Sequence, residues 1–334
     1  MYVIYYDDKK KPIGKSIFQL LEYDSATFNY DTIPCKVGNT LLRKFLNKKI
    51  TILIAGNIFA TGKSFDFNKE IPMSTIFSVM NKVVNALYKS NKTINYTIFK
   101  EFIPSNKNAN LLVKKYKYIQ FHIDDTMEMK LNTSWKKFED LLKEFKTKYR
   151  SRSKQVVLKS SVLKVRELTK EDVEENANKI EDLYQQVLKN SNFNIGVFNV
   201  ETFIRLKEKM PKYYFIYGYF LENELIGFRT LFKAGKVLEA SFIGIDYTKN
   251  LKYNLYQRML IDYVEYGIAN KMEKINFGRT AETIKSCVGA EPVRMNLYVK
   301  ARKKTGKFLL KLIINNIRPT EFSLRRPFKK IHYK

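Results

Sequence analysis

Residues 274–293 of the chain read Lys-Ile-Asn-Phe-Gly-Arg-Thr-Ala-Glu-Thr-Ile-Lys-Ser-Cys-Val-Gly-Ala-Glu-Pro-Val. The run up to Phe277 is typical of a short strand, and it stops at Gly278. A second glycine, Gly289, precedes an alternating apolar segment that resumes at Val293. The pattern predicts a strand, a loop with a glycine near each end, and a second strand.

The loop between the two glycines holds two cations. Thr280 is predicted to cap a short helix over residues 281–287, with Glu282 in its first turn. Arg279 and Lys285 then project from a backbone that both glycines fix. Fixed cations beside a sheet suit an anionic ligand or a developing oxyanion, so we expect a binding or catalytic site here.

These residues resemble a known family. The segments Gly278-Arg279-Thr280-Ala281, Ile284-Lys285 and Val288-Gly289 are similar to the C-terminal motif of Fem-like peptidoglycan-bridge aminoacyltransferases and of related predicted N-acyltransferases. Residues 135–152 resemble the basic helix between the two halves of that family, and Ile54-Ala55-Gly56-Asn57 is similar more loosely. The resemblance touches most of the chain at the level of motifs. It implies an α/β protein with tandem GNAT-like domains, in which mixed sheets are flanked by helices.

The resemblance also implies an activity and a site. In Fem-like enzymes the lysine before the second glycine supports acyl transfer; Lys285 matches that position, while Ile284 departs from the usual aromatic residue. Lys285 is therefore expected to stabilise the tetrahedral oxyanion as an acyl or aminoacyl group passes to an amine, in cell-wall or envelope biosynthesis. No general base is evident in the sequence. The expected substrate-binding residues are Gly278, Arg279, Thr280, Arg229, Tyr253 and Gln257.

Structural interpretations of the cations stay open. Lys285 can form a surface ion pair with Glu282 at i, i+3, and Arg279 can tie down loop carbonyls. Arg229 lies on a largely apolar strand face, where it can pair with an acidic substrate group or with Glu239.

Two halves of the chain show a similar order of elements. In the first half, residues 51–55 and 94–102 are predicted to be strands that flank a helix over residues 73–87. The second half repeats this order with residues 237–245, 256–268 and 275–277. A hairpin over residues 213–233 precedes that repeat. Tandem α/β units follow from the repetition.

The segment between the halves predicts a domain boundary. An apolar stripe from Trp135 to Tyr149 indicates one helix, which continues into a basic run that ends at Lys154. Beyond it, Thr169 with Asp172 predicts a capped helix start. We expect residues 1–150 to form the first GNAT-like domain, residues 151–315 the second with the site, and residues 316–334 a basic tail that packs back on the first domain.

The chain lacks the residues, or the residue spacing, that several familiar active sites require. Residues 56–64 resemble a phosphate-binding loop, but five residues separate the glycines where that motif requires four, so a turn is expected instead. His122 and His332 are the only histidines, and we expect no metal site and no Ser-His-Asp triad. Cys287 is expected to be a small buried residue rather than a nucleophile.

The sequence leaves more than one acyl donor open. GNAT enzymes that use acetyl-CoA hold its pyrophosphate on a glycine-bearing loop at a helix start, but residues 246–254 contain no glycine. An aminoacyl-tRNA donor, as in the Fem-like enzymes, would use the basic surface instead. An acyl-CoA, or another carrier-bound acyl group, remains open; no cofactor is firmly implied.

The formal net charge of +28 is unevenly placed. Basic residues gather over residues 143–170, and residues 300–334 carry twelve Lys or Arg against one Glu. This density favours phosphate-rich partners, namely RNA such as tRNA or an anionic membrane, although a chain-wide compositional bias explains it as well. The alternative functions are therefore a non-catalytic basic module that binds RNA or membrane, and a CoA-dependent small-molecule N-acetyltransferase.

The chain is long enough for two domains, and its composition agrees with a cytoplasmic protein. It has 334 residues, of which 45% are hydrophobic. We see neither a signal peptide nor an apolar run that spans a bilayer, and two cysteines, Cys35 and Cys287, fit a reducing compartment. In the tail, Leu309, Leu312 and Ile313 are expected to pack into the fold while the charges make peripheral contact with the inner face of the membrane.

Overall fold

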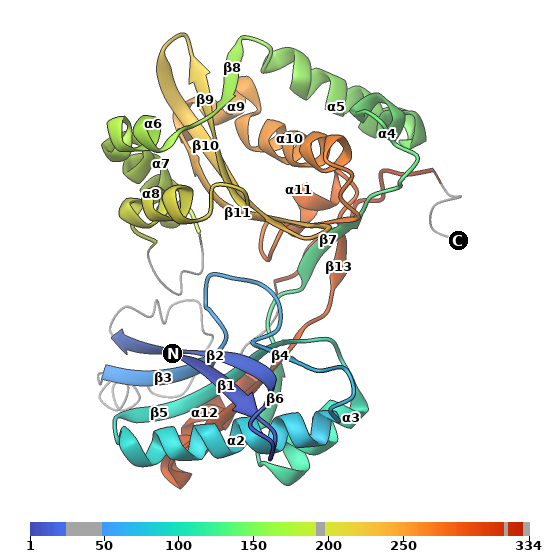
Figure 1. Cartoon of the computed structure of the whole chain (residues 1–334). Coiled ribbons are helices and arrows are strands. Elements are labelled where there is room, and N and C mark those ends of the chain that lie inside the picture. The colour runs from blue at the N-terminus through green and yellow to red at the C-terminus, as the bar shows by residue number, and fades with distance from the viewer. Residues whose placement is uncertain (25–48, 192–197, 317–319, 330–334) are drawn as a thin grey trace. The chain divides into compact units, whose positions relative to one another are not determined.

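The computed structural model describes residues 1–24, 49–191, 198–316 and 320–329 (Figure 1). The chain forms two compact units, and each combines two stretches of sequence. Unit 1 consists of Met1–Asp125 and Arg294–Thr320, and unit 2 consists of Thr126–Val293 and Glu321–Lys334.

Unit 1 is built on a seven-stranded sheet with the order β1-β2-β3-β5-β14-β6, to which β4 adds by pairing with β2. Of its neighbouring strands only β3 and β5 are parallel within the described residues. The strands are β1 (Tyr2–Tyr6), β2 (Pro12–Asp24), β3 (Lys49–Ala55), β4 (Phe65–Phe67), β5 (Ile94–Phe102), β6 (Ile119–His122) and β14 (Asn296–Ala301).

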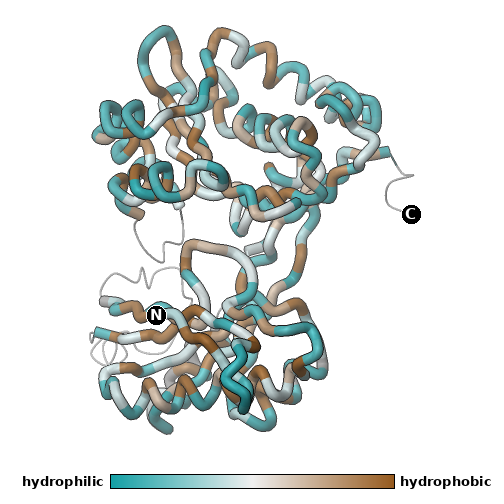
Figure 2. Tube along the Cα trace, in the orientation of Figure 1, coloured by the Kyte–Doolittle hydropathy of each residue, from teal (hydrophilic) through white to brown (hydrophobic). Residues whose placement is uncertain are grey.

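One long helix covers the core of unit 1. Along α2 (Met73–Ser90), Phe77, Met80 and Val84 are fully buried at the three- and four-residue spacing of a helix face. Figure 2 shows the same alternation, with hydrophobic residues (brown) between hydrophilic ones (teal) along this helix. The strands and the helix predicted for the first half are confirmed. The remaining helical segments are α3 (Asn106–Ala109), the π-helical turn η3 (Asn110–Lys115) and α12 (Lys304–Asn316).

Residues 56–64 connect β3 to β4, as the rejected phosphate-loop motif led us to expect. Lys100 of β5 donates through Nζ to the Asn57 carbonyl at 2.7 Å and also to the Ala60 carbonyl. These bonds hold the turn against the sheet. His122 is the last residue of strand β6.

Unit 2 is built on a second seven-stranded sheet, with the order β13-β7-β12-β11-β10-β9-β8. Its one parallel pair among the described residues is β11 with β12. The strands are β7 (Thr126–Lys130), β8 (Leu163–Glu167), β9 (Tyr214–Leu221), β10 (Glu224–Ala234), β11 (Val237–Ile245), β12 (Lys274–Asn276) and β13 (Glu291–Val293). The hairpin and the strands predicted for the second half are confirmed.

Helices flank both faces of the second sheet (Figure 1). One group packs Ile180, Leu183 and Phe203 on β9 and β10, and the other places α10 against the opposite face with Leu260 and Val264. The helices are α4 (Phe138–Glu144), α5 (Thr147–Lys159), α6 (Lys170–Glu175), α7 (Ala177–Lys189), α8 (Val200–Lys209), α9 (Tyr247–Tyr253), α10 (Leu255–Ala269) and α11 (Glu282–Ser286). Mixed sheets flanked by helices in two units confirm the predicted fold class.

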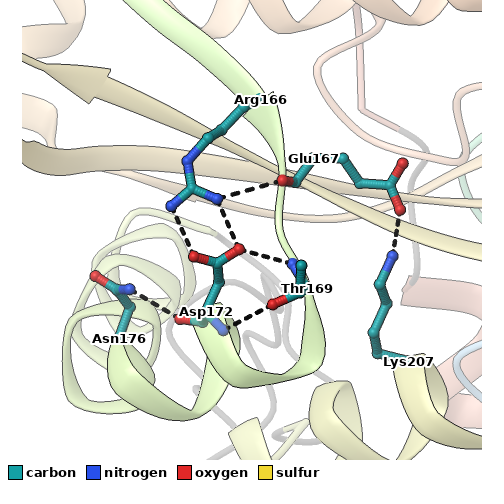
Figure 3. A network of polar contacts seen from close by, with 6 residues as sticks. All are labelled: Arg166, Glu167, Thr169, Asp172, Asn176 and Lys207. Atoms are coloured by element: carbon teal, nitrogen blue, oxygen red, sulfur yellow. Dashed lines mark hydrogen bonds and ion pairs between the residues drawn. The ribbon is translucent and has the colours of Figure 1, made fainter.

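The start of α6 shows how local sequence sets an element (Figure 3). The Asp172 amide donates to Thr169 Oγ1 at 3.1 Å, while the Thr169 amide donates to Asp172 Oδ2 at 2.9 Å, which completes the predicted capping box. Arg166 adds a two-pronged contact to the same carboxylate, at 2.6 and 2.7 Å. The Arg166 guanidinium is the largest cause that lowers the pKa of Asp172 to about 2.

The helix predicted from Trp135 through Lys154 is interrupted. α4 ends at Glu144 and α5 begins at Thr147, because Phe145 turns into the core with an extended backbone. There Phe145 contacts Phe328 of the C-terminal segment at a ring distance of 5.0 Å. A periodic stripe cannot reveal this break, since Phe145 is buried in either conformation.

Each unit contains a strand from the other half of the sequence, so the limits of the units differ from the expected ranges 1–150, 151–315 and 316–334. β7, from before the expected boundary, pairs with β12 and β13, while β14, from after the site, pairs with β5 and β6. The tail also divides, because residues up to Thr320 join unit 1 and the following residues join unit 2. The side chains of Leu309, Leu312 and Ile313 lie outside the described part of the structure. Among the described residues, none of the helices combines the length and apolar character needed to cross a membrane.

Candidate active site

The parallel strands of unit 2 separate at the proposed site. β11 and β12 pair only over Val237–Glu239 and Lys274–Asn276, three residues each. β11 then continues to Ile245, whereas the chain after β12 leaves into the loop that begins at Gly278. The side chains of β11 from Ala240 to Ile243 are partly exposed along this stretch. The loop therefore stands where one edge of a central strand has lost its neighbour.

The backbone of this loop is strained. Gly278, Thr280 and Ala281 have φ angles of 69°, 65° and 51°. A left-handed φ suits glycine, but for the β-branched Thr280 it is an outlier of the kind that gathers at functional sites. The prediction that Thr280 caps the following helix is wrong: Ala281 occupies the cap position without a side-chain hydrogen bond, because the backbone turns too sharply at Thr280.

Lys285 lies on α11 with its side chain directed back at this loop. It is only 6% exposed, and its Nζ donates to the Arg279 carbonyl at 2.6 Å and more weakly to the Gly278 carbonyl at 3.4 Å. Burial away from water lowers the pKa of Lys285 to about 7, against the opposing effect of the Glu282 carboxylate. These two hydrogen bonds use two of the positions on Nζ. The third position carries a proton below a pH of about 7 and a lone pair above it.

The Glu282 carboxylate lies close enough to act electrostatically on both Lys285 and Tyr256, and sequence reasoning assigned neither Glu282 nor Tyr256 a role in the site. Glu282 is 4% exposed at the start of α11, and it makes no ion pair with Lys285 among the described contacts. Burial is the largest cause that raises the pKa of Tyr256, and the Glu282 carboxylate adds to it. The i, i+3 spacing of Glu282 and Lys285 was the available signal, but it also fits an exposed pair.

Arg229 lies elsewhere in unit 2, between β10 and α10. It is 3% exposed, its guanidinium carbon lies 4.3 Å from the ring centre of Tyr217 and 4.8 Å from that of Tyr263, and its Nε donates to the Tyr219 hydroxyl at 2.9 Å. Its Nη1 is buried without a hydrogen-bond partner. Of the two sequence interpretations, the ion pair with Glu239 is not among those of the described residues.

A buried polar chain continues from Arg229. The Tyr219 hydroxyl donates to Asp262 Oδ2 at 2.6 Å, and Arg258 Nε donates to Asp262 Oδ1 at 2.6 Å. Arg258 also reaches Ser160 Oγ at 3.1 Å. Burial, and next the Asp262 carboxylate, raise the pKa of Tyr219 far above its usual range, so the hydroxyl keeps its proton. The chain joins β9 and β10 to α10 and to the end of α5.

The helix start beside the site is occupied. α9 is capped by Asp246, whose Oδ1 accepts the Thr248 amide at 2.9 Å, and Asn254 then adopts a left-handed conformation before α10 begins. The Tyr256 amide in the first turn of α10 donates to Asn250 Oδ1 at 3.0 Å. An amide that a CoA pyrophosphate would use is therefore already paired.

The remaining expected residues, Tyr253 and Gln257, belong to two different helices. Tyr253 belongs to α9, where its ring receives Lys252 at 5.2 Å. Gln257 lines a hollow between α5, α10 and α11, on the side of α11 that carries Ile284 and Cys287 rather than Lys285. The structure thus brings together Gly278, Arg279, Thr280 and Lys285, whereas the described contacts of Arg229, Tyr253 and Gln257 are with other groups. Cys287 is half-buried, and within the described ranges no group of three or more His, Cys, Asp or Glu side chains is placed to hold a metal.

No family model matches the chain, and no curated protein matches it in sequence. Solved structures do match its fold. FemX superposes with a TM-score of 0.55 and 10% identity over 94% of this chain and 90% of that one. L-PGS from Bacillus licheniformis superposes with a TM-score of 0.54 and 10% identity over 95% of this chain and 90% of that one. At this identity the likeness establishes the fold alone: the chain shares the fold of FemX and of L-PGS, and this agrees with the tandem GNAT-like domains expected from the sequence.

Proposed function

We propose that this protein transfers an acyl or aminoacyl group to an amine, with Lys285 as the catalytic residue. The observation that carries the proposal is a buried lysine with a pKa near 7, bonded to a strained loop where the strands of a GNAT fold separate. A purely structural lysine gains stability from staying charged and hydrated. A desolvated lysine with a pKa close to neutrality is typical of reacting sites.

The transfer needs one nucleophile and one stabilised oxyanion. The amine nitrogen of the acceptor attacks the carbonyl carbon of the donor, so a C–N bond forms and the carbonyl oxygen takes the negative charge. Protonated Lys285 donates its third N–H to that oxygen, while Arg279 and Gly278 carbonyls hold the other two. The bond to the leaving oxygen or sulfur then breaks, and the proton from the amine goes to the leaving group.

An aminoacyl-tRNA is the donor that we favour over an acyl-CoA. Residues 246–254 have no glycine, and the Tyr256 amide in the helix start is paired with Asn250. A pyrophosphate would have to displace this bond. The resemblance to Fem-like enzymes, together with the fold of FemX, further supports an amine acceptor in cell-wall or envelope biosynthesis.

A donor assay tests the proposal. Purified protein is incubated with tRNA carrying radiolabelled amino acids, or with labelled acetyl-CoA, in the presence of peptides and small compounds with free amines. We expect label to move from tRNA to an amine, and Lys285→Met to slow this transfer by about 10²-fold or more. Lys212→Met, at an exposed lysine, serves as the matched control and leaves the rate unchanged.

The outcomes separate the alternatives. A folded Lys285→Met protein with wild-type turnover removes Lys285 from the mechanism. Transfer from acetyl-CoA alone restores the N-acetyltransferase interpretation, and RNA binding without transfer from either donor favours a non-catalytic module. Because Lys285 acts in its protonated form, the ratio of the wild-type rate to the Lys285→Met rate should fall as pH rises through about 7, and this ratio cancels the deprotonation of the acceptor amine itself; a ratio that rises instead makes Lys285 the base that accepts the proton of the amine.

A further inference from the structure

Two basic segments that are far apart in the sequence lie side by side in unit 2. One is α5, and the other is the C-terminal segment of residues 321–329. The Lys146 amide donates to the Pro327 carbonyl at 2.7 Å, and the Lys329 amide donates to the Glu144 carbonyl at 3.0 Å. These bonds fix the segment along the start of α5.

An aromatic anchor holds the C-terminal segment in this place. Phe328 is 8% exposed; its ring stacks on Trp135 at 6.1 Å and meets the edge of Phe145 at 5.0 Å. A Cβ built on Gly289 would come within 2.6 Å of the Phe328 ring, so only glycine admits the ring there. The segment is therefore a built part of the unit and not a loose tail.

Three cations converge where this segment passes α11. The Arg325 amide donates to Ser286 Oγ at 2.9 Å, which places Arg325 beside Cys287. Arg152 and Cys287 line the same hollow, and Lys148 precedes Arg152 by one helical turn on the same face of α5. Burial raises the pKa of the Cys287 thiol, and the charges of Arg152, Arg325 and Lys148 oppose that rise, as three nearby cations must.

These cations lack carboxylate partners within the described ranges. Neither Lys148, Arg152 nor Arg325 takes part in an ion pair there. All three are exposed. Cations that gather on one surface without carboxylates beside them favour an anionic ligand.

We infer that Lys148, Arg152 and Arg325 bind two neighbouring phosphate groups, as in a diphosphate, beside the hollow between α5, α10 and α11. Lys148 and Arg152 stand on α5 and Arg325 on the C-terminal segment, so the cations come from two elements beside one hollow, which suits a compact anion better than the flat surface of a membrane. Gln257 and Tyr149, which also line the hollow, offer polar contacts to the part of the ligand next to the phosphates. As recognition of a transfer substrate this inference rests on the proposed function, but the binding itself needs no turnover.

Calorimetric titration of the full chain with inorganic diphosphate and with ADP, at low ionic strength, tests the inference. We expect both to bind, and Arg152→Gln or Arg325→Gln to weaken binding by about tenfold each, because each removes a charge-assisted contact. Lys154→Gln is the matched control: it removes the same charge from α5, but two residues from Arg152 and thus on another face of the helix. It should change the affinity less than twofold.

Other results overturn the inference. If Lys154→Gln weakens binding as much as Arg152→Gln, the charge of unit 2 acts diffusely and there is no site. If inorganic diphosphate and ADP do not bind while an RNA stem–loop or phosphatidylglycerol vesicles do, the cations serve an extended polyanion instead. Lys285→Met should retain diphosphate binding, so a failure of the transferase proposal leaves this result intact and a failure here leaves the transfer assay intact.

Discussion

Replacing Lys285 by Met should change how the stability of unit 2 depends on pH. Lys285 is buried, and its pKa falls from 10.5 in the unfolded chain to about 7 in the folded protein. Between these two values the unfolded chain binds a proton that the folded protein does not. The free energy of unfolding therefore rises with pH in this window, is lowest below about pH 7, and reaches its full value above the unfolded pKa.

The size of the effect follows from the pKa difference. Each unit of difference corresponds to about 1.4 kcal/mol, so the burial of charged Lys285 destabilises the folded state by about 5 kcal/mol at low pH. Between pH 7 and 9.5 the wild-type protein should regain about 3 kcal/mol relative to Lys285→Met. The carbonyls of Arg279 and Gly278 lose their donor in the variant, which adds an offset that does not depend on pH.

Urea denaturation at several pH values measures this difference. The single tryptophan, Trp135, is 7% exposed in unit 2 and donates to Glu144 at 2.7 Å, so its fluorescence reports the unit that contains Lys285. Tyrosines with raised pKa values are present in both proteins and cancel in the comparison. Lys212→Met, at an exposed lysine, is the control and should show a constant difference from wild type. A difference between wild type and Lys285→Met that stays constant within 1 kcal/mol (about one pKa unit) would refute the burial of Lys285 and the catalytic role that depends on it.

Three further predictions concern the framework of the site. Tyr219→Phe removes the hydroxyl between Arg229 and Asp262, and because two buried charged groups each lose a partner, we expect the unfolding free energy to fall by about 3 kcal/mol. A loss of less than about 1 kcal/mol in a urea titration would contradict the network. Gly289→Ala should lower Tm much more than Gly278→Ala, because the new Cβ meets the Phe328 ring at 2.6 Å in the first variant and no atom within 4 Å in the second. Equal shifts of Tm in calorimetry would show that Phe328 is not anchored. Thr280→Gly should raise the unfolding free energy by about 1 kcal/mol, because glycine accepts the left-handed φ. It should also slow transfer if the strained loop positions Lys285. A loss of stability would mean that the Thr280 side chain holds the loop.

Much of the local structure could be predicted from short-range patterns. The helix of residues 73–87, the strand of residues 237–245 and the capping box of Thr169 with Asp172 are confirmed, because hydrophobic period and cap chemistry act over a few residues. The glycine-bounded loop after β12 was predicted in the same way. Its inner conformation was not: Thr280 has the residue type of a cap, but the turn at Ala281 removes it from that role.

The candidate site, too, was predicted in part from local patterns, and the rest required the tertiary structure. Residue type and spacing pointed to Lys285, but they fitted an exposed ion pair with Glu282 as well as a reacting group. Only the packing of α11 decided that Lys285 is desolvated and bonded to loop carbonyls. Arg229 and Gln257 were also expected near Lys285. Strand alternation and helix starts indicate the face on which a side chain lies, but not its distance from another element. The fold places Arg229 under α10 and Gln257 on the far side of α11.

The tandem α/β units, the order of their elements and the loop that carries Lys285 could be predicted without coordinates, because they depend on periodicity, glycine and charge within short windows; the GNAT-like class followed from the resemblance of motifs. Only the tertiary structure decided which strands pair across the two halves, since β7 and β14 join sheets on the far side of the expected boundary. It also decided that the basic C-terminal segment meets the basic helix α5. Contacts over such separations are set by core packing, where Phe328 fills a space that Gly289 leaves open, and no local pattern in the chain encodes that fit.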